Sequence, residues 1–365
     1  MSNNRLNYDK KEFRTPITGT WTMKTSFTET FGVERPLVCP GMSYIAVPEL
    51  VAAVSNAGGL GILASGPLSP QATREAIHRI RKLTDRPFGV GCTLMMPGAA
   101  DNAKVALEEQ VPVINFSLGK GDWIVEGARR YGGKVIATVV TEKHAQSAER
   151  IGVDALLVTG HEAAAHGGEV TSLVLVPAIR RVSQLPIIAA GGFADGAGLL
   201  AALALGADAV AMGSRLAMTQ ESPVHDRTKG LIRDKSVNDT IYSRNFDGLY
   251  CRVMDTPTAR RATRRPLGLA TAAWRSMGQA RRMQMPVGKV VLGGLLRQPQ
   301  ALRQLAQFGA ATESIRLAIE DGNHERGVQL IGQVQGLIDD VPSVGELFER
   351  IMAEALATRE RLAGL

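Results

Sequence analysis

The sequence is short of aromatic side chains. Its 365 residues include 9 Phe, 5 Tyr and 3 Trp, so that aromatic residues make up 5% of the chain. Proteins that bind single-stranded nucleic acid by stacking its bases depend on aromatic platforms, and no nucleic-acid motif stands out along the chain. We therefore expect no nucleic-acid partner.

Cysteine is also scarce. Cys39, Cys92 and Cys251 are isolated from one another, and none belongs to a C-x-x-C pair or to a histidine-containing metal spacing. A disulfide framework or a zinc site requires such spacings. The sequence supports neither, and we expect no metal. A sparse, odd number of cysteines is typical of a reducing compartment.

Long apolar runs are missing as well. No stretch of 18 or more apolar residues exists, which predicts no transmembrane helix. The N-terminal MSNNRLNYDKKEFR is polar and charged and lacks the apolar core of a secretory signal. We expect a cytoplasmic protein with no membrane partner. The net charge of +7 comes partly from local arginines, which suit either a solvated basic face or an anionic ligand: Arg260, Arg261, Arg264, Arg265, Arg281 and Arg282.

Glycine is abundant, with 39 residues. From residue 35 onward a short apolar run is followed by a glycine-containing turn and then by a helical stretch. Continuous rather than alternating apolar character is typical of strands that are buried on both faces of a parallel sheet. The runs predict eight strands: Pro36–Pro40, Leu60–Ala64, Pro87–Cys92, Val113–Phe116, Lys134–Val139, Ala155–Val158, Pro186–Ala189 and Ala209–Met212.

The segments between these runs predict helices: Pro48–Asn56, Gln71–Leu83, Ala99–Glu109, Asp122–Tyr131, Glu142–Ile151, Leu173–Gln184 and Gly196–Leu205. Alternation of buried strands with helices indicates βα units, and eight units favour closure into a (β/α)8 TIM barrel of the α/β class. A doubly wound open sheet is the alternative, but no G-x-G-x-x-G follows the first strand.

The alternation of predicted strands and helices ends after Ser222, and we expect the chain to divide into four parts. Thr240–Met254 predicts a hairpin, and Val344–Leu362 predicts an amphipathic helix. The expected parts are an irregular N-terminal extension (1–30), the barrel (31–222), a smaller and mostly helical cap domain that is inserted after the eighth strand and shapes the substrate pocket (223–330), and C-terminal helices that pack back on the barrel (331–365).

Two glycine-rich turns follow the last two predicted strands. Gly191 and Gly192 come directly after the seventh strand, and Gly213 and Ser214 come after the eighth. In α/β barrels the loops at these places form a phosphate site with a helix N-terminus. Glycine lets the backbone approach closely, and amide N–H groups and the helix dipole stabilise the anion. The turns predict a phosphate-bearing ligand, and a plain tight turn is the alternative.

His166 is the candidate catalytic residue. It lies in the stretch Thr159–Gly168, directly after the sixth strand, on the face where barrel active sites occur, and three alanines precede it. Histidine titrates near neutral pH and therefore suits proton transfer. His161 is a weaker candidate, and we expect Glu162 to have a structural part.

These stretches resemble the nitronate monooxygenase family, formerly called 2-nitropropane dioxygenases. The resemblance covers residues 38–222 and is weaker toward the C-terminus. Flavin enoyl-ACP reductases and certain NADH:quinone reductases share its motifs, which therefore do not single out one reaction. The motifs are Pro40-Gly41-Met42, the stretch 160–168, which is similar to the family's G-x-E-A-G-G-H-x-G, Ala190-Gly191-Gly192, and the stretch 204–215.

The resemblance implies an FMN cofactor in the barrel. His166 occupies the position of the family's catalytic histidine. The residues implied to contact the flavin ring are Gly41, Met42, Gly91, Thr138, Thr159 and Ala164, and those implied to hold the phosphate are Gly191, Gly192, Gly213 and Ser214.

Several positions depart from the family's pattern. Ala164-Ala165 replaces Gly-Gly, which would narrow the pocket slightly. Gly91 stands where many relatives carry Asn, so that a hydrogen bond to the flavin is either missing or supplied by Thr93. Thr138 and Thr159 stand where relatives often have Lys and Gln or Asp. Fewer charged groups beside the ring would change its redox potential, and so the reaction itself is not fixed by the resemblance.

The first functional hypothesis is a nitronate monooxygenase that oxidises alkyl nitronates with dioxygen to a carbonyl compound and nitrite. His166 would stabilise the anion or remove a proton from the nitroalkane. The alternative is an NAD(P)H-dependent flavin reductase that acts on an enoyl thioester or a quinone. A non-redox barrel that binds a sugar phosphate or nucleotide is a third. The first two hypotheses require a small-molecule substrate and either dioxygen or NAD(P)H as co-substrate. The sequence leaves open whether the protein forms a homodimer.

Overall fold

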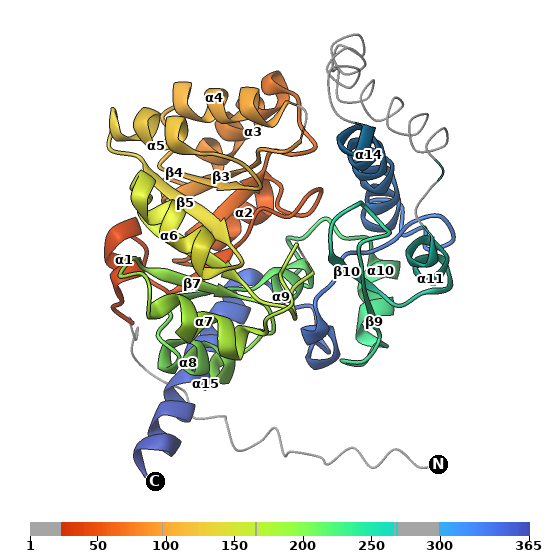
Figure 1. Ribbon diagram of the computed structural model, residues 1–365. Helices are drawn as coiled ribbons and strands as arrows, with labels where there is room; N and C mark the ends of the chain where they lie inside the picture. The colour runs from red at the N-terminus through yellow and green to blue at the C-terminus, as the bar shows by residue number, and fades with distance from the viewer. Residues whose placement is uncertain (1–22, 97, 165, 266–267, 269–298) are drawn as a thin grey trace.

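Eight parallel strands form a closed barrel in the order of the chain (Figure 1). The computed structural model describes residues 23–96, 98–164, 166–265, 268 and 299–365. The strands are β1 (Leu37–Cys39), β2 (Leu60–Ala64), β3 (Phe88–Thr93), β4 (Val113–Ser117), β5 (Lys134–Val139), β6 (Ala155–Thr159), β7 (Ile187–Ala190) and β8 (Ala209–Ala211). The predicted TIM barrel is confirmed, and each strand lies within one residue of its predicted bounds.

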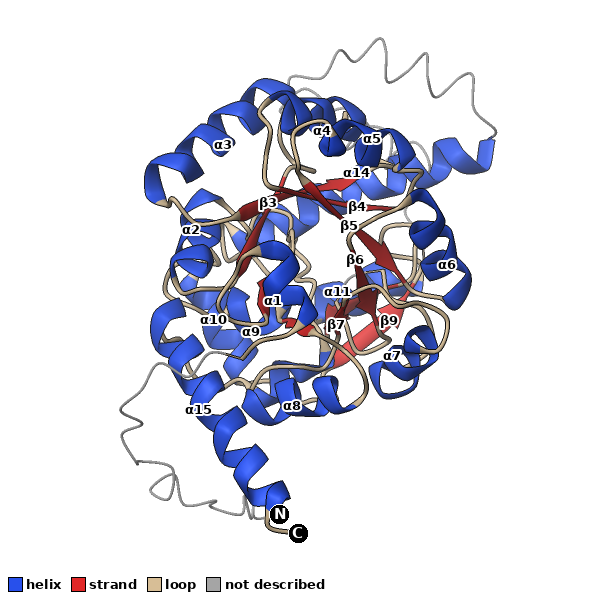
Figure 2. Ribbon diagram, turned by 90° about the vertical axis from the view of Figure 1, so that its left-hand side faces the viewer, coloured by secondary structure: helices blue, strands red, loops and turns tan. Residues whose placement is uncertain are grey.

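Helices cover the outside of the barrel, as Figure 2 shows. The seven that follow β1 to β7 are α2 (Pro48–Asn56), α3 (Pro70–Leu83), α4 (Ala99–Glu108), α5 (Asp122–Arg129), α6 (Glu142–Ile151), α7 (Ser172–Arg180) and α8 (Gly196–Ala204). The predicted end of α7 is wrong by four residues. The helix ends early because the Arg180 guanidinium donates to the backbone carbonyls of Ser183 and Leu185, where the chain turns into β7.

The eighth place in the wall is filled by α15 (Val344–Ala363), which packs against α8 and α2. It buries Leu347, Phe348 and Ile351. The contact with α8 is close, since a Cβ at Gly196 would lie 2.2 Å from the backbone nitrogen of Ala355. Helix α15 matches the amphipathic helix predicted at 344–362.

A short helix, α1 (Ser26–Phe31), closes the N-terminal end of the barrel and lies across its opening in Figure 2. Phe27 and Phe31 belong to the same buried cluster as the inward-facing strand residues, among them Leu60 and Ile136. The prediction that residues 1–30 are irregular is wrong for this part, because Thr25 starts the helix with a capping box. A six-residue helix is too short to show a period in the sequence.

Between β8 and α15 the chain leaves the barrel, and we call the described residues of this part, 218–265, 268 and 299–343, the connecting segment. It follows α9 (Gly213–Ala217) and contains α10 (Asp226–Arg233), α11 (Pro257–Arg264), α14 (Pro299–Ile319) and a short 3-10 helix at Gln333–Leu337. It also holds the predicted hairpin, with β9 (Thr240–Ser243) antiparallel to β10 (Cys251–Met254). Its standing as a separate cap domain, and the boundaries at 223 and 330, stay predictions.

The connecting segment lies beside the C-terminal ends of the strands, on the right in Figure 1. The backbone N–H of Arg252 donates to the Ala164 carbonyl at 3.2 Å, and that of Gln333 donates to the Glu162 carbonyl at 2.9 Å. It is therefore bonded to the loop after β6. Across the described ranges, no helix combines the length and apolar character that a membrane span needs.

Replacing Phe27 with alanine should lower the free energy of unfolding by about 3–5 kcal/mol, the usual cost of such a change at a buried site. Its side chain is 0% exposed where α1 meets the barrel interior. The shift in a urea denaturation curve measures the loss. Leu173→Ala is the control, because Leu173 is 67% exposed and should change stability by only about 0.5 kcal/mol. Equal denaturation midpoints for the two variants would contradict the conclusion that α1 closes the N-terminal end of the barrel.

Candidate active site

One cavity of about 800 Å³ lies at the C-terminal ends of the strands. Parallel strands bring these ends to the same rim, so residues far apart in the sequence meet there. The cavity is lined by His166 and by every residue that the sequence singled out for the cofactor: Gly41, Met42, Gly91, Thr138, Thr159, Ala164, Gly191, Gly192, Gly213 and Ser214. The structure brings the whole predicted set together, while the role of each residue stays a proposal.

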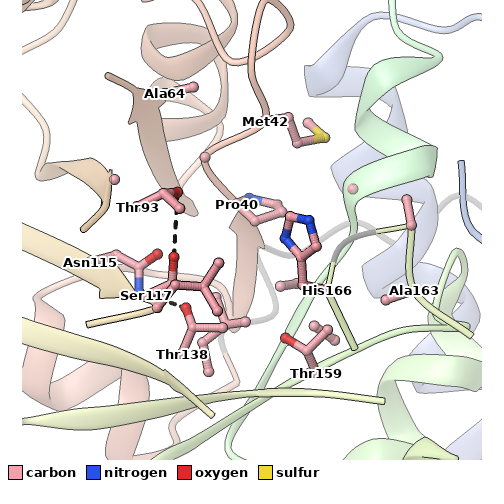
Figure 3. A pocket seen from close by; sticks show the side chains of 18 of the residues that line it. Pro40, Met42, Ala64, Thr93, Asn115, Ser117, Thr138, Thr159, Ala163 and His166 are labelled. Carbon is pink, nitrogen blue, oxygen red and sulfur yellow. Dashed lines mark hydrogen bonds between the residues drawn. The ribbon is translucent and has the colours of Figure 1, made fainter. Parts of the chain in front are cut away.

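Strands β3 to β6 each contribute neutral polar side chains to the lining of the cavity. Figure 3 shows Thr93, Asn115 and Ser117 on one side of the pocket and His166 across from them. The amide of Asn115 donates to the Thr138 hydroxyl at 3.1 Å, and Ser117 donates to Thr93 at 3.4 Å. These bonds hold the side chains in fixed orientations toward a ligand.

Asn115 was missed in the sequence because it sits inside an apolar run. It is 8% exposed, and its amide also donates to the Ile136 carbonyl at 3.1 Å. The available signal was a lone polar residue within the strand. Residues 113, 115 and 117 share one face of the strand, and Val113 belongs to the cluster inside the barrel.

The glycine turn after β7 has a backbone that only glycine adopts freely. Gly191 has φ +106° and Gly192 has φ +86°, in the region that disfavours a Cβ. A Cβ at Gly191 would also lie 3.0 Å from the Ser172 hydroxyl and 3.2 Å from the Ala163 nitrogen. The turn therefore exposes bare backbone to the cavity, which suits a ligand that approaches amide groups.

The turn after β8 meets the connecting segment. The Ser214 hydroxyl accepts a hydrogen bond from the Gly332 N–H at 3.0 Å, which leaves its own O–H free to donate to a ligand. A Cβ at Gly332 would lie 2.9 Å from the Glu162 carbonyl oxygen. Gly332 is a further residue of the site, and no local motif could have found it, since it lies 118 residues from Ser214.

His166 is held by a carboxylate from the connecting segment. Its Nε2 lies 2.8 Å from Oδ2 of Asp247, which sits between β9 and β10 and is 2% exposed. A carboxylate accepts, so Nε2 carries the proton of this bond. Nδ1 has no hydrogen-bond partner among the described residues and is the nitrogen available to a ligand. The Phe308 ring of α14 packs near the imidazole, with ring centroids 5.8 Å apart.

Cys251 adds to the surroundings of Asp247. Burial, together with the negative charge of Asp247, raises the pKa of the Cys251 thiol well above its usual value. The thiol therefore stays protonated and places no second negative charge beside the carboxylate. Asp247 also accepts the N–H of Leu249 at 3.0 Å, so both of its oxygens have partners.

The loop that carries His166 is fixed at two further points. The Glu162 carboxylate accepts from the Ser172 N–H at 3.0 and 3.1 Å and from its hydroxyl at 3.0 Å. It thereby caps α7, which is the structural part expected of it. The guanidinium of Arg252, which is 4% exposed, donates to the His161 carbonyl at 2.9 Å. Burial lowers the pKa of Arg252, and the nearby Tyr242 and Glu162 oppose this.

A closed parallel barrel with glycine turns and a carboxylate-held histidine at its C-terminal rim is the architecture of a (β/α)8-barrel enzyme. A sequence model of the family described as Nitronate monooxygenase matches residues 24–354. The chain belongs to this family and is an oxidoreductase.

The proteins that this chain resembles are named after different enzymes. A (3aS,4S,5R,7aS)-5-hydroxy-7a-methyl-1-oxo-octahydro-1H-indene-4-carboxyl-CoA dehydrogenase of Mycobacterium tuberculosis is 36% identical over 352 residues, which is 94% of this chain and 99% of the relative. A probable nitronate monooxygenase of Staphylococcus aureus is 28% identical over 275 residues, which is 63% of this chain and 78% of the relative. Among solved structures, FabK from Thermotoga maritima is 37% identical, with a TM-score of 0.79 over 94% of this chain and 99% of FabK.

Replacing Gly191 with alanine should destabilise the protein by about 1–3 kcal/mol, because a left-handed backbone is costly for alanine and its Cβ would press on Ser172 and Ala163. Thermal unfolding measures this. Gly230→Ala in α10 is the matched control, since nothing beyond its chain neighbours and the backbone of its own helix lies within 4 Å of the added Cβ, and it should stabilise by roughly 0.5–1 kcal/mol. A Gly191 variant as stable as the control would contradict the geometry of the turn.

Proposed function

We propose that the protein is an FMN-dependent oxidoreductase that acts on an acyl-CoA thioester. The observation that carries the proposal is a histidine inside the cavity, held through Nε2 by a buried carboxylate and free at Nδ1. The substrate class is supported by the Mycobacterium tuberculosis relative, which is named as a carboxyl-CoA dehydrogenase and matches along almost its whole length.

The residues present fit FMN. The cavity of about 800 Å³ lies in the upper part of the range for ligand and cofactor sites, which leaves room for a substrate beside a nucleotide. Gly191, Gly192, Gly213 and Ser214 offer backbone amides and a hydroxyl to the phosphate. A Cβ at Gly41 would lie 3.6 Å from the Gly91 Cα, and side chains at these two positions would narrow the cavity.

The ring would lie against Gly41, Met42, Gly91, Thr138, Thr159 and Ala164. When bound, FMN would supply the two-electron acceptor for a dehydrogenation or the donor for a reduction. The hydroxyls of Thr138 and Thr159 would orient the ring without adding charge.

His166 would move the proton. Asp247 fixes the imidazole in the form protonated at Nε2, as a buried carboxylate does for a catalytic histidine in other enzymes. Nδ1 would then take the proton from the carbon next to the thioester carbonyl, or return it in the reverse direction. Phe308 and Met42 line the same cavity and would exclude water from the reacting carbon.

Nitronate oxidation is the second candidate, and it was the first hypothesis from the sequence alone. It is favoured by the family match and by the Staphylococcus aureus relative. His166 would then take a proton from a nitroalkane, and dioxygen would be the co-substrate. We rank it second because that relative covers less of the chain at lower identity.

Anaerobic absorbance spectra of the FMN-loaded protein separate the candidates. We expect the flavin to bleach on addition of a saturated cyclic acyl-CoA, or to bleach with NADH or NADPH and reoxidise with the matching enoyl-CoA. If an alkyl nitronate bleaches the flavin but the acyl-CoA, NADH and NADPH do not, the thioester proposal is rejected. A protein that stays colourless with added FMN would reject both candidates.

His166→Asn should keep FMN binding and lower turnover by roughly 10²–10⁴-fold, the usual contribution of a proton-transfer group. Asp247→Asn should lower turnover in the same direction, because an amide no longer selects the Nε2-protonated form. Steady-state rates and flavin fluorescence titrations measure the two effects. His78→Asn on the outer face of α3 is the control, and undiminished turnover in the His166 variant would remove it from the mechanism.

A further inference from the structure

The loop after β4, residues 118–121, forms part of the cavity rim. Leu118, Gly119 and Lys120 are exposed, and all three line the cavity. Within the described ranges, no hydrogen bond or ion pair joins this loop to the connecting segment, which is bonded instead to the loops after β6 and β8. A substrate that extends out of the cavity can therefore pass over this loop.

The loop has a fixed shape. Leu118 has φ +51°, a conformation that bulky residues rarely adopt. A Cβ at Gly119 would lie 2.5 Å from the Leu94 Cβ, and a Cβ at Gly121 would lie 2.5 Å from the Phe116 ring. The backbone on both sides of Lys120 is therefore pressed onto neighbouring side chains, and the lysine projects from a defined place on the rim.

Lys120 is an unusual charge in this cavity. It is the one Lys or Arg among the described residues that line it, and it makes no ion pair or hydrogen bond with any of them. The acids deep in the cavity are already engaged, Asp247 by His166 and Glu162 by Ser172. Asp122 at the start of α5 and His144 in α6 are further titratable residues that line the cavity.

We propose that the Leu118–Gly121 loop recognises the phosphate-bearing pantetheine arm of the thioester substrate, with Lys120 binding a phosphate. The inference rests on the proposed thioester function and deepens it. A lysine ammonium binds phosphate as a point charge. The arm would leave the cavity over the exposed Leu118 side chain while the acyl group lies beside His166.

The test compares two thioesters of the same acyl group, one of CoA and one of N-acetylcysteamine, which carries no phosphate. In Lys120→Ala, the ratio of kcat/KM for the CoA thioester to that for the short thioester should fall about tenfold, through KM rather than kcat, as the loss of one charged hydrogen bond predicts. Lys120→Arg should restore most of the ratio. Lys143→Ala is the matched control, because Lys143 is exposed on α6 and does not line the cavity.

Calorimetry with CoA alone gives a second measure on the full-length, FMN-loaded protein. CoA should bind the wild type about tenfold more tightly than Lys120→Ala, and the difference should shrink at high salt. An unchanged ratio of kcat/KM, or an equal loss for both thioesters, would overturn the inference. If neither thioester is turned over by the wild type, the proposed function fails, and the CoA affinities still decide whether this loop binds phosphate.

Discussion

The hydrogen bond between His166 and Asp247 joins the two parts of the chain that form the site. Asp247 is almost fully buried, so its charge is tolerated only with partners close at hand. His166 and the Leu249 N–H supply them. On the same hairpin, Arg252 holds the loop after β6 through the carbonyls of His161 and Ala164. Loop and hairpin therefore fix the orientation of the imidazole jointly, and neither could do so alone.

The parts of the fold that depend on short-range patterns could be predicted from the sequence. Each barrel strand is a continuous apolar run because it is buried on both faces, and that character is visible over a few residues. The glycine turn at Gly191 and the position of His166 after β6 are local in the same sense. Once eight strands are placed in order, the closed barrel brings their ends together without further information.

What could not be predicted depends on long-range contacts or on very short elements. Asp247 lies 81 residues from His166, and nothing in its own surroundings in the sequence marks it as a partner of that side chain. Gly332 meets Ser214 only because the connecting segment returns to the barrel. Asn115 is hidden in an apolar strand, and α1 is too short for a periodic signal. Each of these features depends on contacts that form only in the folded protein.

The place of α15 in the wall has a consequence for how the molecule is made. Synthesis proceeds from the N-terminus, so β8 leaves the ribosome well before α15. During that interval the surfaces of α2 and α8 that α15 covers lack this helix, and Gly59 lacks the Phe348 ring that covers it in the finished fold. The wall of the barrel therefore stays incomplete until the connecting segment and α15 have both been made.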